Sequence, residues 1–235
     1  VFGLLGIELG LLQPALFQAL PERIFGIMAN DTLLAIPFFT SMGLILERSG
    51  MAEDLLDTIG QLFGPMRGGL AYAVIFVGAL LAATTGVVAA SVISMGLISL
   101  PIMLRYGYDK RLASGVIAAS GTLAQIIPPS LVLIIMADQL GKSVGDMYEG
   151  AIIPGLILTS LYVGYVVILS IIKPNSCPAL PAEARTLRGF KLMLRVLTTL
   201  VPPLLLIFLV LGTIFLGIAT PTEGGAMGAT GALIL

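Results

Sequence analysis

Two polar stretches set in apolar sequence carry residue types that can bind an ion or a small solute. The first is 84–86, and the second runs from Ser120 to Ser130 and contains the consecutive prolines Pro128 and Pro129. Hydroxyl, amide and free carbonyl oxygens are hard ligands that can replace the water around an alkali cation. The sequence therefore predicts a site built from neutral oxygens.

The prolines of the second stretch predict a break in a helix. Residues 112–137 carry no charged side chain, which is typical of a membrane-embedded helix. Pro128 and Pro129 have no N–H to donate, so the carbonyls of Ala124 and Gln125 would lose their helical partners. The alternative is a plain proline kink, in which neighbouring helices provide hydrogen-bond partners for the freed carbonyls. The Ser, Gly, Thr and Gln residues around the prolines favour a binding site.

The first stretch lies inside a long uncharged run, residues 68–104. As one helix this run would be roughly 55 Å long, whereas two full spans would need about 40 residues. A turn at 84–86 leaves two arms, 68–83 and 87–104, because Gly86 accepts the backbone conformation of a helix C-cap. We interpret the run as a re-entrant hairpin, and two short spanning helices with a tight loop are the alternative.

Charge placement assigns the helix ends to membrane faces. Arg67 precedes the hairpin and Arg105 follows it. Residues 138–149 hold one Lys against three acidic residues, whereas residues 173–195 hold five Lys and Arg against one Glu. Because cytoplasmic loops are enriched in Lys and Arg, the hairpin ends and residues 173–195 are predicted to lie inside, and 138–149 outside.

Composition restricts the class of protein. A mean hydropathy of +1.07, with 57% hydrophobic and 11% charged residues, predicts an all-α polytopic membrane protein embedded in the lipid bilayer. The single cysteine, Cys177, and the absence of histidine exclude an intrachain disulfide, a cysteine metal cluster and histidine-based catalysis. We therefore expect neither an enzyme nor a nucleic-acid partner.

Other segments are assigned from capping residues and apolar periodicity. Residues 24–46 form a candidate span interrupted near Asp31, the predicted helix N-cap, and by Pro37. Residues 51–66 predict an amphipathic helix along the membrane interface. Its apolar face comprises Met51, Leu55, Leu56, Ile59, Leu62, Phe63 and Met66.

Glycines mark helix ends and close helix contacts further along the chain. Gly107 and Asp109 are a predicted C-cap and N-cap pair. Residues 150–172 and 196–222 are predicted to run inward and outward across the membrane. Small residues at the spacing of closely packed helices follow, namely Gly224, Gly228 and Gly231.

Four motifs, in order, resemble the large membrane subunit of TRAP (tripartite ATP-independent periplasmic) transporters, the DctM family. They are RYGYDK at 105–110, GTLAQIIPPS at 121–130, AIIPG at 151–155 and GIATPTEGGAMG at 217–228. The similarity covers nearly the whole chain and is strongest to the mannitol/chloroaromatic-type branch. Two features depart from the family pattern: Ala124 stands where Gly is common, and the hairpin tip reads ATTGVVAAS instead of an SGSAVAD-type sequence.

The resemblance implies an elevator-type secondary transporter of the bacterial inner membrane. Each of two inverted repeats would contribute a re-entrant hairpin and a broken helix, with the solute and Na⁺ bound between them and no further cofactor. The implied partners are a smaller TRAP membrane subunit and a periplasmic solute-binding protein that delivers a small organic acid. A stand-alone carboxylate or ion symporter of related architecture, without a binding protein, is the alternative.

The expected organisation follows from that scheme. Residues 1–66 would be scaffold helices with the interfacial helix, and 67–149 half of the transport domain, with the hairpin at 68–104 and the broken helix at 110–138. A transmembrane helix at 150–172, a cytoplasmic linker at 173–195 and a truncated second repeat at 196–235 would follow. The chain is thus expected to be a fragment of the transporter.

The expected site joins the two polar stretches. The candidate solute-binding and ion-binding residues are Thr84, Thr85, Gly86, Ser91, Ser120, Gly121, Thr122, Gln125, Pro128, Pro129 and Ser130. The candidate Na⁺ ligands among them are Thr85, Gly86, Gly121, Thr122 and Gln125.

Overall fold

The structure is a computed structural model that describes all residues except 1, 11–12, 14, 87 and 186–188. Its described regular elements are all helices, which confirms the predicted fold class. The α-helices are α1 (Phe2–Glu8), α2 (Ala15–Met28), α3 (Ala35–Arg48), α4 (Met51–Phe63), α5 (Gly69–Thr85), α6 (Val88–Arg105), α7 (Lys110–Thr122), α8 (Leu131–Leu140), α9 (Val144–Ile172), α10 (Phe190–Phe215) and α11 (Pro221–Ile234). The short 3₁₀ helices are η1 (Asp31–Leu34), η2 (Leu123–Gln125), η3 (Pro174–Ser176) and η4 (Ala182–Ala184).

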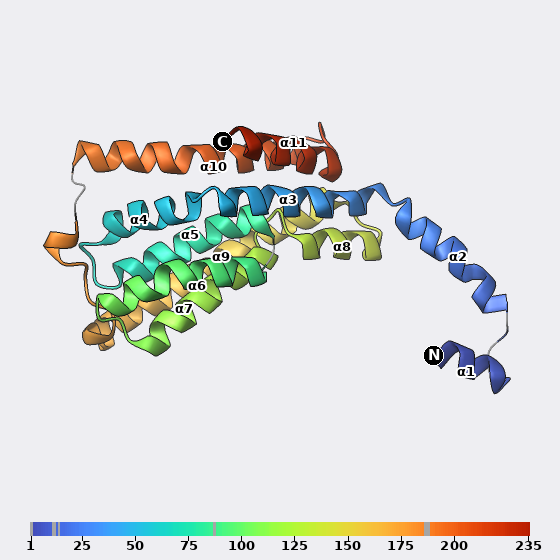
Figure 1. Cartoon of the computed structure of the whole chain (residues 1–235), viewed down its shortest axis with the longest axis horizontal. Helices are drawn as coiled ribbons and strands as arrows, with labels where there is room; N and C mark the ends of the chain where they lie inside the picture. Colours follow the sequence, from blue (N-terminus) through green and yellow to red (C-terminus); the bar gives the residue numbers. More distant parts are fainter. Residues whose placement is uncertain (1, 11–12, 14, 87, 186–188) are drawn as a thin grey trace.

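Helices α3 to α11 form an elongated bundle, from which α2 and α1 extend outward (Figure 1). Among the described residues, α6, α9 and α10 are long and apolar enough to cross a membrane. The segments Ala19–Met28 and Asp31–Arg48 pass the same test together, bent by 48°. Helix α8 has only ten residues, about half of what a span requires.

The hairpin forms with its turn where the sequence predicts it. Helix α5 ends at Gly86, which has a φ of 59° and donates its N–H to the carbonyl of Ala82 at 3.3 Å. Helix α5 is apolar on every side, and most of its residues are buried between neighbouring helices. The helix–turn–helix is therefore confirmed, and its re-entrant placement in the membrane stays a prediction.

The broken helix also forms. Helix α7 passes into η2, the chain is irregular from 126 to 130, and α8 starts at Leu131. Asp109 caps α7 by accepting hydrogen bonds from the N–H groups of Arg111 at 2.8 Å and Leu112 at 3.3 Å. Gly107 has a φ of 82°, so the predicted cap pair is confirmed.

The cap near residue 31 is assigned differently from the prediction. Asn30, and not Asp31, is the N-cap of η1, since its side chain accepts a hydrogen bond from the N–H of Thr32 at 3.0 Å. The amide of Asn30 also donates to Oδ1 of Asp138 at 2.5 Å. An amide can accept and donate at once, so Asn30 both caps η1 and binds α8.

Helix α9 begins earlier than expected, at Val144 instead of residue 150. Gly141 ends α8 in the left-handed conformation, with a φ of 61°, and Ser143 is the extended N-cap of α9. Much of the expected loop 138–149 is therefore helical, because these two adjacent caps make a very short connection.

Helix α4 is amphipathic, but its buried face is rotated relative to the prediction. Leu62 and Met66 are 43% and 48% exposed, whereas Thr58 and Gln61 are buried. The physical reason is that α4 packs against both α5 and α10 (Figure 1), while Gln61 faces a cavity that it lines together with Leu180 and residues of α5 and α6. The placement of α4 along the membrane interface stays a prediction. Any such placement has to allow α4 to pack against the apolar helix α10.

Helix α11 packs closely through its glycines, as predicted. A Cβ on Gly228 would lie 2.5 Å from the sulfur of Met42 in α3, and one on Gly231 would lie 2.5 Å from Cδ1 of Leu206 in α10. Such distances leave no room for a side chain, so the small residues allow α11 to sit against both helices.

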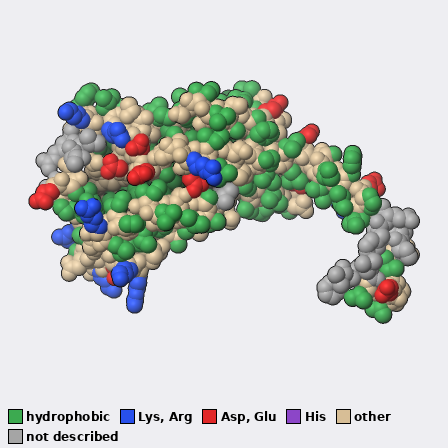
Figure 2. Space-filling view, viewed as in Figure 1, with side chains coloured by type: hydrophobic (Ala, Val, Ile, Leu, Met, Phe, Trp, Pro, Cys, Tyr) green, Lys and Arg blue, Asp and Glu red, His purple; other side chains and the backbone are tan. Residues whose placement is uncertain are grey.

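A segment that we call the strap, residues 173–181, closes one end of the bundle. Its carbonyls at Cys177 and Ser176 accept the N–H groups of Gly68 and Asp109, each at 3.0 Å, and the N–H of Leu180 donates to Gly64 at 2.9 Å. Lys and Arg side chains gather towards this end (Figure 2). The turns that precede α5 and α7 therefore share one end with the strap, as the charge pattern predicts; Arg188 lies outside the described residues.

Candidate functional site

The hairpin tip contacts the break in the broken helix. A Cβ built on Gly86 would lie 3.2 Å from Cγ of Leu131 and 3.4 Å from the carbonyl oxygen of Pro129. Gly86 is buried and has a positive φ, so glycine suits this position both in conformation and in space. The structure thus brings the two polar stretches together.

Both helices of the hairpin, α5 and α6, pack closely against α7, the helix before the break. A Cβ on Gly121 of α7 would lie 2.2 Å from Cγ2 of Val92 in α6. A Cβ on Gly78 of α5 would lie 2.6 Å from Cβ of Ser120. Sequence reasoning missed Gly78 and Val92. An isolated glycine in an apolar helix is a signal for close packing that could have identified Gly78, whereas Val92 carries no such signal.

Three hydroxyls of the predicted site bond to carbonyls of their own helices. Thr84 donates to Leu81 at 2.8 Å, Ser120 to Ile117 at 3.0 Å and Thr122 to Ala119 at 2.7 Å. A hydroxyl that donates its proton in this way keeps its oxygen lone pairs for another partner. These oxygens can therefore still bind a cation.

The predicted residues differ in accessibility. Thr84, Ser91, Ser120, Ser130 and both prolines are buried, whereas Thr122 and Gln125 are exposed. The side chain of Thr85 lies outside the described residues. Among the described candidate side chains, Thr122 and Gln125 are thus the ones that an ion can reach without a change in the conformation of the protein.

Ser130 spans the break and changes one expectation. Its hydroxyl donates to the carbonyl of Gln125 at 2.7 Å and accepts the N–H of Leu133 at 3.4 Å, as the N-cap of α8. The carbonyl of Gln125 was expected to be free and is not, because the capping side chain reaches back to it. A carbonyl has two lone pairs, so one remains for an ion.

Tyr148 of α9 is a further polar group at the break that sequence reasoning missed. Its side chain is fully buried, and its hydroxyl lies beside the backbone of Ser130 without a hydrogen bond of good geometry. A buried polar atom without a well-formed hydrogen bond is rare, and a bound water or ion is one common explanation for it. A single tyrosine in the short stretch before an apolar run gives no sequence signal for this position.

The chemistry of the site is that of binding. Among the described residues, no group of three or more His, Cys, Asp or Glu side chains could hold a metal ion. The tip and the break provide hydroxyl, amide and carbonyl oxygens, which suit an alkali cation. Among the described side chains of the tip and the break, none pairs a nucleophile with a general base.

Comparison with known proteins identifies the family. Residues 4–235 match the family described as "Tripartite ATP-independent periplasmic transporter, DctM component". The chain belongs to the DctM family. The family is described as a transporter component, and relatives of the chain are named as permease proteins and not as enzymes, which agrees with the expectation from the sequence.

Several DctM relatives are similar over most of the chain. The C4-dicarboxylate TRAP transporter large permease protein of Pseudomonas aeruginosa is 34% identical over 219 residues, covering 93% of this chain and 50% of the relative. The 2,3-diketo-L-gulonate TRAP transporter large permease protein of Escherichia coli is 30% identical over 207 residues, covering 87% and 46%. The isethionate TRAP transporter permease protein of Oleidesulfovibrio alaskensis is 30% identical over 203 residues, covering 86% and 31%.

This DctM chain spans about half the length of the first two of these relatives. The names of the relatives include a C4-dicarboxylate, a diketo sugar acid and isethionate. The family is thus established, and the mannitol/chloroaromatic-type branch is not confirmed.

Proposed function

We propose that this chain is part of the large permease component of a TRAP transporter that couples Na⁺ entry to the import of a small organic acid. The observation that carries the proposal is the contact between the hairpin tip at Gly86 and the break before Leu131. Because of that contact, the ends of four helices converge within the apolar bundle.

The helix ends supply the electrostatics for binding a cation and an anion together. The C-terminal ends of α5 and of α7 with η2 carry partial negative charge, which favours Na⁺. The N-terminal ends of α6 and α8 carry partial positive charge, which favours a carboxylate. Discontinuous helices in membrane transporters use their ends in this way.

The proposed Na⁺ ligands are neutral oxygens. Hydroxyl oxygens of Thr85 and Thr122, the amide or carbonyl of Gln125, and backbone atoms of Gly86 and Gly121 form the proposed set. Neutral oxygens can replace the hydration shell of Na⁺ without burying a carboxylate. This choice of ligands supports Na⁺ over a proton as the coupling ion.

Membership of a tripartite family supports two proposed partners. They are a smaller TRAP membrane subunit and a periplasmic binding protein that delivers the solute. The family match disfavours a stand-alone symporter. We propose an organic acid as the solute because relatives are named for such compounds. Membership of the mannitol/chloroaromatic-type branch is a separate proposal, and it does not determine the solute.

The test is Na⁺-dependent uptake by the complete transporter in proteoliposomes. Thr122→Val should raise the Na⁺ concentration for half-maximal uptake at least several-fold, because it removes an exposed hydroxyl oxygen at the break. Thr122→Ser keeps the hydroxyl and should stay near the original value. Thr198→Val is the matched control: the Thr198 hydroxyl bonds to carbonyls of its own helix, α10, in the same way.

Two outcomes would contradict the proposal. Uptake driven equally well by a pH gradient in the absence of Na⁺ would exclude Na⁺ coupling. An equal shift in Thr122→Val and Thr198→Val would show that the effect does not arise at the tip and the break.

A further inference from the structure

A cavity of about 590 Å³ opens between α5, α7 and α9 at the strap end of the bundle. Asp109, Arg111 and Lys173 lie at its charged end, and Val116, Tyr162 and Leu169 line its apolar part. None of these residues belongs to the candidate site at the tip and the break.

The lining changes from charged to apolar along the helices. From Arg111 to Ala119 along α7 is about 12 Å, and from Lys173 back to Tyr162 along α9 is about 16 Å. Arg111 lies in the first turn of α7, Lys173 follows α9 as the first residue of the strap, and the residues further along each helix are mainly apolar. The cavity is therefore amphipathic, with its polar end at the predicted cytoplasmic face.

The charges at the polar end favour an anion. The carboxylate of Asp109 already accepts hydrogen bonds from the N–H groups of Arg111 and Leu112 as the N-cap of α7. Among the described residues, the ion pair present is that between Arg195 and Asp54. Arg111 and Lys173 therefore form no ion pair with a carboxylate in the described part of the chain. Two cations against one engaged carboxylate leave one net positive charge for a ligand.

We propose that this cavity binds an anionic phospholipid of the cytoplasmic leaflet. The phosphate would lie between Arg111 and Lys173, and an acyl chain would run towards Ala119 and Tyr162. Basic pockets between membrane helices on the cytoplasmic side have the chemistry to bind anionic headgroups. The apolar wall formed by Val116, Tyr162 and Leu169 would accommodate an acyl chain while the headgroup stays at the charged end.

The test uses the protein purified from the membranes of its host, with short-chain phosphatidylglycerol as the probe. Phosphatidylglycerol should raise the melting temperature, whereas phosphatidylcholine with the same acyl chains, and glycerol 3-phosphate, should not. The double variant Arg111→Gln, Lys173→Gln should bind phosphatidylglycerol at least tenfold more weakly. Arg105→Gln removes an exposed cation that does not line this cavity and should bind as the original protein does.

Equal binding of the two lipids, or an equal loss in Arg105→Gln, would overturn the proposal. Glycerol 3-phosphate binding as tightly as the lipid would show that the site takes a soluble phosphate and not a phospholipid.

A second pair of variants tests the acyl chain. Gly115 lines the cavity, and a Cβ there would meet no atom within 4 Å, so Gly115→Leu has room for its Cβ and places its remaining atoms in the cavity. Gly164 of α9 has the same open surroundings and does not line the cavity. Gly115→Leu should lose phosphatidylglycerol binding while keeping both cations, and Gly164→Leu should retain it. Unchanged binding in Gly115→Leu would overturn the acyl placement.

Discussion

Gly121 of α7 and Val92 of α6 are in such close contact that a Cβ at position 121 would lie 2.2 Å from Cγ2 and 3.2 Å from Cα of Val92. Gly121→Ala is therefore expected to destabilise the protein by about 1–3 kcal/mol, the usual effect of overpacking. Val92→Ala in the same chain should recover part of that loss, because it removes Cγ2 at 2.2 Å but keeps Cα and Cβ, which both lie at 3.2 Å. Thermal unfolding of the single and double variants measures the coupling.

Gly115→Ala is the control for that cycle. It adds a Cβ on the same helix where no atom lies within 4 Å, and it should be neutral or slightly stabilising because alanine favours helix. A double variant no more stable than Gly121→Ala alone would contradict the contact.

Tyr148→Phe separates stability from function. The hydroxyl of Tyr148 is buried beside the backbone of Ser130 without a well-formed hydrogen bond, so its removal should leave the free energy of unfolding unchanged or raise it by up to about 1 kcal/mol. The Na⁺ concentration for half-maximal uptake should nevertheless rise, because the hydroxyl lies beside Ser130 at the break that forms part of the proposed site. Melting temperature and uptake measured on the same preparation test both results, and a less stable variant would contradict the assignment of the hydroxyl as lacking a well-formed hydrogen bond.

Cys177, the single cysteine of the chain, is a poor reporter of topology. Its side chain is fully buried, and burial raises the pKa of its thiol, although Arg67 acts in the opposite direction. Because the thiolate is the reactive form, a raised pKa lowers reactivity at neutral pH. Labelling by an impermeant maleimide should thus be slow from either side and increase only as the pH rises towards the raised pKa.

Introduced cysteines can test the predicted topology instead. In a Cys177→Ser background, Ser143→Cys and Asn175→Cys place thiols at exposed positions near opposite ends of α9. In spheroplasts, an impermeant maleimide should label Ser143→Cys directly and Asn175→Cys only after permeabilisation. The reverse pattern would invert the predicted orientation of Lys142, Glu149 and the strap.

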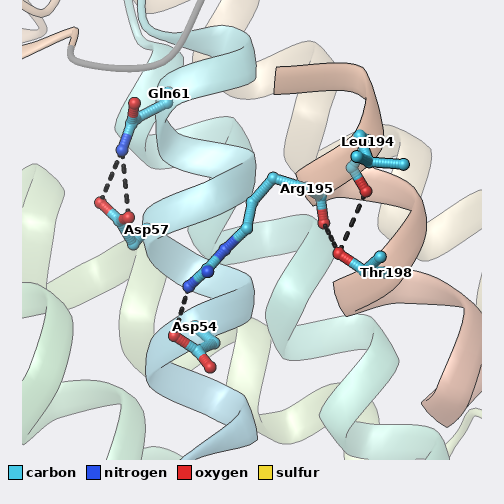
Figure 3. Close-up of polar contacts among 6 residues, drawn as sticks. All are labelled: Asp54, Asp57, Gln61, Leu194, Arg195 and Thr198. Atoms are coloured by element: carbon cyan, nitrogen blue, oxygen red, sulfur yellow. Dashed lines mark hydrogen bonds and ion pairs between the residues drawn. The ribbon is translucent and has the colours of Figure 1, made fainter. Parts of the chain in front are cut away.

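The ion pair between α10 and α4 should contribute little to stability. Arg195 reaches from α10 to Asp54 at 3.0 Å (Figure 3), and both side chains are about half exposed, at 47% and 62%. Exposed pairs of this kind contribute about 0–1 kcal/mol. Arg195→Ala should therefore change the melting temperature only slightly.

Leu55→Ala provides the contrast on the same helix as Asp54. Leu55 is fully buried in the core, so its truncation should destabilise the protein by about 2–5 kcal/mol. A larger loss in Arg195→Ala than in Leu55→Ala would show that the ion pair, and not the apolar face, holds α4 in place.

Local signals account for what the sequence predicted well. The turn at Gly86 and the break at Pro128 depend on backbone conformation and missing N–H donors, which are properties of those residues themselves. The cap at Asp109 is equally local. The sequence did not predict the contact of Gly121 with Val92 or the burial of Cys177, because both depend on which helices pack together.

The remaining differences have the same origin. The choice between Asn30 and Asp31 as a cap depends on α8, since only Asn30 donates a hydrogen bond to Asp138. The buried face of α4 depends on a neighbour, α10, that lies more than a hundred residues further along the chain. Periodicity within one segment does not contain that information.

The strap has a mechanical consequence for any movement of the hairpin. It bonds to Gly64 after α4, to Gly68 before α5 and to Asp109 before α7, and Pro178 lies beside Gly107. A movement of α5 and α7 relative to α4 must therefore break the hydrogen bond between Leu180 and Gly64. If that bond is kept, the strap and α4 must move together with α5 and α7. In the second case the sliding surface lies on the far side of α4, and α4 becomes part of the moving body.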